Sequence, residues 1–168
     1  MAWNKEQNIR ESSEWLVDKF RLLDDKEKML NKQKSKPVVN GKKPALRQVY
    51  RGGVYWVNFG KGNLGAEKNK TRPAVIISPN HLNKAETVLV VPISSKFPFK
   101  LKDGVKLPKH RNHFLLYKNK YPELDETSAI KCEDLKCIDV ARIGDLIFNI
   151  SKDDMKLLKS RLLYMLGF

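Results

Sequence analysis

Three short runs of β-branched and aromatic residues constrain the fold more than any other feature of this sequence. They are VYWVNF (54–59), AVIIS (74–78) and TVLVVPIS (87–94). Glycine flanks the first run, proline flanks the second, and Asn83 lies shortly before the third. Runs of this length and composition predict strands. Because they do not alternate with polar residues, both faces of the sheet should be covered, as in a small closed barrel.

Weaker strand patterns follow, and the chain is expected to end in a helix. These patterns are HFLLY (113–117), SAIKC (128–132) and KCIDV (136–140). Ser151 is a good N-cap and Gly167 a good helix stop. One face between them carries Met155, Leu158, Leu162, Leu163 and Leu166. This part of the chain is therefore expected to be mainly β with helices.

The first part of the chain predicts one long amphipathic helix, because no proline or glycine interrupts residues 4–34. Spacings of four and three residues connect Ile9, Ser13, Leu16, Phe20, Leu23, Glu27 and Leu30. Such a heptad seam fits a helix packed on its own domain, paired with a partner subunit, or bound to a partner protein or membrane surface. The Pro-, Gly- and Lys-rich stretch 34–47 is typical of a linker. We therefore divide the chain into a helical extension, residues 1–46, and a domain, residues 47–168.

The charge of the chain favours a polyanionic partner. Lysine and arginine number 33 against 19 acidic residues, a formal net charge of +14. Nucleic acid, an acidic protein and an anionic membrane face all fit such a surplus. The excess lies mainly in residues 47–168, and segment 96–120 alone carries +7. Its aromatic residues fit either stacking on unpaired bases or a place in the core: Phe97, Phe99, Phe114 and Tyr117.

Several classes of protein are disfavoured. The longest apolar runs, such as VLVVPI (88–93), are far shorter than the ~18 residues of a spanning helix. The N-terminus does not have the pattern of a secretory signal. Cys132 and Cys137 have a poor spacing for zinc or for a disulfide framework. We expect a cytoplasmic protein with reduced thiols and without a metal or cofactor.

The chemistry-bearing residues lie at junctions between loops and strands, where function is often found. The loop GKGNLGAEKNKT (60–71) is long for a compact barrel but is not a phosphate-binding P-loop, because the G-K-[ST] ending is missing. Glu67 lies in this loop and Arg72 closes it. A third site is PISSK (92–96), where Pro92 is expected to break the strand ladder.

From Arg51 onward the chain resembles the MazF/PemK/Kid family, the ribonuclease toxins of toxin–antitoxin pairs. The resemblance rests on RGGVYWVNF (51–59), KTRPAVII (70–77) and TVLVVPISSK (87–96), with LPKH (107–110) and EDLKCID (133–139) completing it. It implies an SH3-like antiparallel barrel with added helices, usually a homodimer, that cleaves single-stranded RNA at short sequences without a metal. It also implies an acidic antitoxin as partner, and contact with promoter DNA only through the antitoxin complex.

The resemblance assigns roles position by position. The essential arginine of the family falls on Arg72, its catalytic hydroxyl on Ser94 and its loop glutamate on Glu67. The residues expected to contact RNA are Lys68, Lys70, Thr71, Ser95, Lys96, Lys109 and His110. The chain departs from the family pattern at Gly53, where aspartate is usual, at Ala66, where serine is frequent, and at Lys109, which replaces a threonine.

Arg72 suits charge stabilisation because a guanidinium forks two donors to phosphate oxygens and is a poor base near neutrality. The general base stays open between Glu67 and His110, and His110 fits a packed strand histidine better. Two other functions also stay open. One is a gyrase-binding toxin of the related CcdB fold, and the other is an inactive SH3-like nucleic-acid-binding module.

Overall fold

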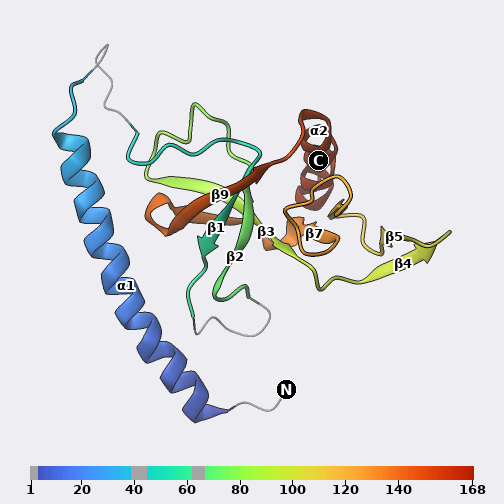
Figure 1. The fold of residues 1–168 in the computed structure, drawn as a ribbon, viewed down its shortest axis with the longest axis horizontal. Coiled ribbons are helices and arrows are strands. Elements are labelled where there is room, and N and C mark those ends of the chain that lie inside the picture. The colour runs from blue at the N-terminus through green and yellow to red at the C-terminus, as the bar shows by residue number, and fades with distance from the viewer. Residues whose placement is uncertain (1–3, 39–44, 62–66) are drawn as a thin grey trace.

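The computed structural model describes residues 4–38, 45–61 and 67–168. It confirms a mainly β fold with a helix at each end (Figure 1). The main sheet contains β1 (Gly53–Asn58), β2 (Thr71–Ile76), β3 (Thr87–Ser94), β6 (His113–Leu116), β7 (Ser128–Lys131), β8 (Lys136–Asp139) and β9 (Ile143–Asn149). The other elements are the hairpin β4 (Phe99–Lys102) and β5 (Val105–Pro108), the helices α1 (Lys5–Lys34) and α2 (Lys152–Leu166), and the short turns η1 (Cys132–Asp134) and η2 (Val140–Arg142).

Strand β3 is the centre of the SH3-like barrel. The antiparallel order is β6-β7-β3-β2-β1-β9, and β8 pairs with β3 as well. The first half of β3, from Thr87 to Val90, pairs with β8, whereas Ile93 and Ser94 pair with β7. Pro92 was predicted to break the ladder, but it does not. It lies where β3 changes from one partner to the other, and it still pairs with Ala74 of β2. Its missing N–H is tolerated at such a change of partner.

Both faces of the sheet are covered, as the apolar runs predict. On one face the neighbouring residues Val54, Val75 and Val91 pack in a cluster that also contains Leu158 of α2. On the other face the buried residues are Val49, Tyr55, Val57, Phe59, Ala74, Ile76, Val88, Val90, Ile138, Val140 and Ile143. Two apolar layers therefore fix the positions of β1, β2 and β3.

Helix α2 begins and ends where the sequence predicts. The Ser151 side chain accepts a hydrogen bond from the Asp154 amide, and Gly167 ends the helix at a positive φ of 84°. The buried Asp154 carboxylate accepts hydrogen bonds from Tyr121 and Lys120. Burial acts to raise the pKa of Asp154, but these two donors outweigh it and hold the pKa below its usual value.

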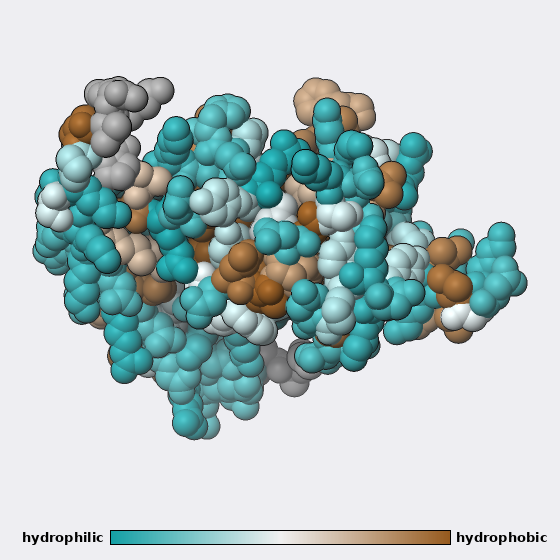
Figure 2. Space-filling model, turned by 45° about the horizontal axis from the view of Figure 1, so that its top comes forward, coloured by the Kyte–Doolittle hydropathy of each residue, from teal (hydrophilic) through white to brown (hydrophobic). Residues whose placement is uncertain are grey.

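The sequence did not predict β9 or the hairpin of β4 and β5. The hairpin, which we call the arm, extends from the barrel on the side opposite α1 (Figure 1). Its turn contains Asp103 and Gly104, both at positive φ, a pair that favours tight hairpin turns. Lysines alternate with apolar residues along it, so Figure 2 shows hydrophilic and hydrophobic side chains side by side on the arm.

Helix α1 packs on its own domain, one of the three arrangements expected from its sequence. The Trp15 ring lies beside Gly60, where a Cβ would come within 3.1 Å of it, and 5.1 Å from the Arg142 guanidinium. Lys26 forms ion pairs with Glu86 (2.8 Å) and Asp139 (2.6 Å). Within the described part of the chain, neither helix has the length and apolar character needed to cross a membrane.

Candidate active site

Arg72 is held inside a strand instead of at its mouth. Strand β2 begins at Thr71, three residues before the apolar run that predicts it, so Arg72 pairs with Val57 of β1. The side chain is half-buried, and its Nε donates a hydrogen bond of 2.9 Å to the Asn69 carbonyl. Backbone and side chain are therefore both fixed, which leaves the terminal guanidinium nitrogens as the donors for a ligand.

Arg72 lines a cavity of about 360 Å³ between the sheet and the segment that precedes β7. Trp56, which is 46% exposed, and Ser95 contribute to the same cavity. Three carboxylic acids from one short segment also line it: Glu123, Asp125 and Glu126. The remaining wall is mostly apolar and consists of Pro73, Ile93, Leu124, Ser128, Ile147 and Phe148. The cavity thus combines a guanidinium, an aromatic ring, a hydroxyl and carboxylates.

Of the two serines at the end of β3, Ser95 lines the cavity and Ser94 does not. Successive side chains of an extended chain point to opposite sides, so Ile93 and Ser95 share the cavity side. The Ser94 hydroxyl accepts a hydrogen bond from the Lys96 amide (3.2 Å) and donates one to the Lys96 carbonyl (3.1 Å). Arg72 therefore shares the cavity with Ser95, whereas Ser94 closes a local turn beside it.

Residues 67–70, the described end of the loop between β1 and β2, lead directly into the strand that carries Arg72. Glu67 is exposed and is not among the residues that line the cavity. Lys68 forms a 3.0 Å ion pair with Asp134, which ties the loop to η1. Lys70 adopts a positive φ of 65° at the base of the loop, and Thr71 pairs with Asn58. Ala66, one of the departures from the family pattern, lies outside the described residues.

Lys96, Lys109 and His110 are exposed near the base of the arm. The Lys109 amide donates a hydrogen bond of 3.2 Å to the Pro98 carbonyl. The interpretation of His110 as a packed strand histidine is wrong, because it lies in the turn before β6. The packed histidine is His113, whose Nε2 lies 2.8 Å from Glu133 Oε1.

The contact with His113 also affects Glu133. Burial acts to raise the pKa of Glu133, but the hydrogen bond with His113 and the charge of Lys131 lower it below its usual value. Glu133 is thus an ionised partner of a buried ring, outside the residues that line the cavity.

The departure at Gly53 has a steric reason. A Cβ at this position would lie 2.5 Å from a carbon of the Tyr55 ring and 3.1 Å from the Tyr50 carbonyl. The Tyr55 hydroxyl accepts a hydrogen bond from the Tyr50 amide, which holds the ring in place. An aspartate at 53 would require Tyr55 to move.

The described residues contain no group of three or more His, Cys, Asp or Glu placed to hold a metal ion. Both cysteines are free thiols. Burial raises the pKa of Cys132 to about 12, so this thiol stays protonated and is a poor nucleophile or ligand near neutrality.

Sequence reasoning missed Trp56 and the acidic segment 123–126. Trp56 looked like one more core residue of an apolar strand. The segment PELDE carries three acidic residues within a strongly basic domain. This local reversal of charge could have identified the segment as a candidate part of the site.

Comparisons with known proteins agree with this architecture. Residues 50–166 match the family model described as PemK-like, MazF-like toxin of type II toxin–antitoxin system. MazF (Form-I) from Deinococcus radiodurans superposes with a TM-score of 0.56 at 18% identity, covering 73% of this chain and 99% of that one. An endoribonuclease in complex with its cognate antitoxin from a Mycobacterial species gives a TM-score of 0.52 at 16% identity, covering 71% and 96%. The Mycobacterium tuberculosis toxin MazF-mt6 gives 0.52 at 13% identity, covering 69% and 97%.

At these identities the structural likenesses speak for the fold alone, whereas the family model matches more than half of the chain. The motifs RGGVYWV and TRPAVII form the paired strands β1 and β2, in which Arg72 of β2 lies opposite Val57 of β1. This chain therefore belongs to the PemK-like, MazF-like family of toxins of type II toxin–antitoxin systems.

Proposed function

We propose that this toxin is an endoribonuclease that cleaves single-stranded RNA at specific sequences without a metal ion. The attacking group is the 2′-hydroxyl of the RNA itself. The observation that supports the proposal is the fixed guanidinium of Arg72 in a cavity that also holds a hydroxyl and three carboxylates. Attack of a 2′-oxygen needs proton removal, stabilisation of the phosphorane charge and protonation of the departing 5′-oxygen. These needs match the side chains in the cavity.

Arg72 stabilises the negative charge that develops on the phosphate. Its hydrogen bond to the Asn69 carbonyl fixes the guanidinium before substrate arrives, so little reorganisation is needed during the reaction. Its terminal nitrogens can donate to two phosphate oxygens at once. Ser95 supplies a neutral hydrogen bond in the same cavity, and Ser94 holds the turn that carries it.

The general base comes from the acidic segment. Glu123, Asp125 and Glu126 share the cavity with Arg72, whereas the exposed Glu67 does not line it. A carboxylate there accepts the 2′-hydroxyl proton as the 2′-oxygen attacks phosphorus. The bond from phosphorus to the 5′-oxygen breaks, and the departing 5′-oxygen takes its proton from solvent water. The same carboxylates disfavour a second phosphate, so the bases on either side of the scissile bond are the groups that fit the rest of the cavity.

Substrate RNA is bound by stacking and by charge. Trp56 offers a partly exposed ring in the cavity, and base–aromatic stacking contributes about 1–3 kcal/mol per base. The basic segment 96–120 begins beside Ser95 of the cavity and includes the arm. Lys96, Lys109 and His110 are exposed near the base of the arm. The lysines of the arm neutralise phosphates farther along the strand.

The proposed partners follow from the family. Solved relatives include an endoribonuclease with its cognate antitoxin. By analogy, we infer an acidic antitoxin for this chain, a homodimer of the domain, and a cytoplasmic site of action, where the RNA is. Contact with promoter DNA would occur only through the antitoxin complex.

End-labelled RNA incubated with purified protein in EDTA tests the proposal. We expect cleavage at defined sites, leaving a 2′,3′-cyclic phosphate and a 5′-hydroxyl. A matched RNA with 2′-deoxy sugars at the cleavage sites should stay intact. Cleavage that requires added metal would refute the mechanism. The absence of cleavage together with inhibition of gyrase would favour the CcdB-like function, and RNA binding without cleavage would favour an inactive module.

A further inference from the structure

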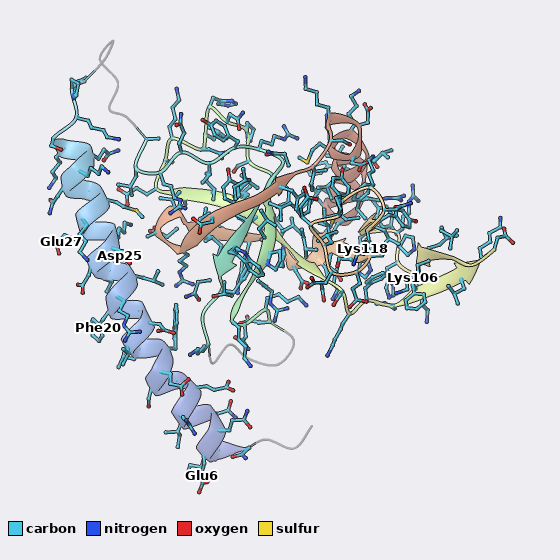
Figure 3. All side chains as sticks on the ribbon, in the orientation of Figure 1. Glu6, Phe20, Asp25, Glu27, Lys106 and Lys118 are labelled. Carbon is cyan, nitrogen blue, oxygen red and sulfur yellow. The ribbon has the colours of Figure 1, made fainter. Side chains whose placement is uncertain are left out.

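The outward face of α1 carries apolar side chains that the domain leaves uncovered. This surface, which we call the α1 stripe, consists of Ile9, Leu16, Val17, Phe20 and Leu23, each between 51% and 60% exposed. With about 100° between successive residues, the centre of the stripe lies about 110–130° around the helix from Lys26 and Trp15, which contact the domain. Leu23, at the edge of the stripe nearest the domain, also lines a shallow groove with Lys26 and Arg142. Phe20 and Glu27 point away from the sheet in Figure 3.

The helix is fixed to the domain at several points, so the stripe has a defined position. Lys26 is held by Asp139 and Glu86 at the C-terminal half of the helix. Lys61 forms ion pairs with Glu14 (3.1 Å) and Asp18 (3.4 Å) nearer the N-terminal end. A partner that covers the stripe therefore meets a preorganised helix, which reduces the entropy cost of binding.

We propose that the α1 stripe binds the same stripe of a second copy of this chain, as an antiparallel helix pair. The stripe follows the four-and-three spacing of a heptad seam, the pattern of helices that pair with other helices. In the pair, Leu16 packs against Phe20 of the second copy and Phe20 against its Leu16. Helix α1 lies outside the residues that match the toxin family, so this contact is additional to any made by the domain.

The charges of α1 favour a second copy over an acidic partner. Residues 5–34 contain eight basic and seven acidic residues, nearly neutral, whereas residues 47–168 carry a net charge of +10. An acidic protein would thus be attracted to the domain more than to α1. An antiparallel pair centred between Leu16 and Phe20 brings Arg10 beside Asp24 of the second copy, twice by symmetry. A parallel pair in register would instead place Glu27 against Glu27.

The exposed area agrees with a weak but specific contact. Five side chains that are each about half exposed bury roughly 500 Å² per copy, or about 1,000 Å² in total, the lower limit of specific interfaces. We therefore expect a dissociation constant in the micromolar range.

Sedimentation of the full chain between about 1 and 100 μM tests this proposal. The double variant Leu16→Glu, Phe20→Glu should raise the dissociation constant of the helix contact at least tenfold, and at high concentration the average mass should fall toward that of the species held together by the domain alone. The matched control Arg21→Gln, Lys28→Gln lowers the net charge equally at exposed positions beside the stripe. It should keep the wild-type mass. Circular dichroism and thermal unfolding show whether the variants are folded.

Cross-linking tests the orientation and does not depend on how the glutamate variants fold. A mixture of Leu16→Cys chains and Phe20→Cys chains, both with Cys137→Ser, should form a disulfide-linked heterodimer, because an antiparallel pair packs Leu16 against Phe20 of the second copy. Leu16→Cys alone in the same background should not form a disulfide-linked dimer. A cross-link through Leu16→Cys alone would overturn the antiparallel pair.

A wild-type mass for folded Leu16→Glu, Phe20→Glu at every concentration would overturn the second copy as the occupant. If the variant keeps the wild-type mass but binds the antitoxin or anionic vesicles more weakly, the second copy is also overturned. The antitoxin or the membrane surface is then the occupant of the α1 stripe. These measurements do not involve RNA cleavage, so their outcome is separate from that of the proposed function.

Discussion

Replacement of Arg72 by alanine should remove most RNA cleavage while the protein stays folded. The Arg72 Nε donates a hydrogen bond to the Asn69 carbonyl that stabilises the fold, and the side chain is only half-buried. Losing this bond and part of the packing around its aliphatic stem should cost about 1–2 kcal/mol. A domain of this size is typically stable by about 5–15 kcal/mol, so the variant should be folded at 25 °C.

The effect on cleavage should be much larger than the effect on stability. Removing one preorganised donor from a developing oxyanion lowers the rate about 10² to 10³-fold, equivalent to about 2.7–4 kcal/mol. Arg72→Lys should recover only part of this loss, because an ammonium cannot present two aligned donors. Ser95→Ala and Ser94→Ala should each have smaller effects, since only one neutral hydrogen bond is lost in each.

The assay is single-turnover cleavage of end-labelled RNA in EDTA, with thermal unfolding of each variant measured in parallel. Lys84→Ala, at an exposed position outside the residues that line the cavity, is a control for loss of a positive charge and should cleave at the wild-type rate. If folded Arg72→Ala cleaves RNA as fast as the wild type, the assignment of charge stabilisation to Arg72 is wrong.

Three further predictions concern the arm, the extension and the α2 cap. Changing Lys100, Lys102 and Lys106 together to glutamine should reduce the slope of log binding constant against log salt by about 2, at about 0.7 per phosphate contact, as measured by fluorescence anisotropy; an unchanged slope would place the RNA path along the loop between β1 and β2. A folded chain that begins at Leu46 should cleave RNA within about tenfold of the full chain, because the residues lining the cavity all lie after it, and complete loss of cleavage would contradict this. Asp154→Asn should cost about 1–3 kcal/mol of unfolding free energy near pH 7. Because the pKa of folded Asp154 lies below its ordinary value of 3.8, that stability is present above this value and is lost as the pH falls through the lower, folded pKa. Urea unfolding of both proteins should therefore converge in strong acid, and a constant difference would refute the role of the ionised carboxylate.

Local patterns determined much of the fold. Strand β3 runs from Thr87 to Ser94 as its apolar run predicts, and α2 is capped by Ser151 and Gly167 as expected. Helix α1 is also present as predicted, from Lys5 to Lys34. These elements depend on neighbours within a few residues, such as caps, β-branched runs and the absence of proline, so the sequence alone is enough to recognise them.

Elements that depend on distant partners were harder to predict. Strand β9 has a weak pattern of its own and forms because β1 offers it an edge. Pro92 is accommodated only because β3 exchanges β8 for β7 at that point. Only the structure shows which way the heptad seam of α1 faces. Periodicity defines an apolar face of the helix, but it does not say whether the domain or solvent lies against that face.

The candidate site likewise contains one residue that the sequence identified and several that only the tertiary structure brings to it. The family resemblance, carried by RGGVYWVNF, KTRPAVII and TVLVVPISSK, singled out Arg72 from the sequence. Only the tertiary structure brings Arg72 together with Trp56, Ser95 and the acidic segment 123–126, and turns Ser94 away from the cavity. The physical reason is that a cavity is enclosed by segments far apart in the chain. The side on which each side chain lies is set by strand register and packing, which a local pattern does not specify.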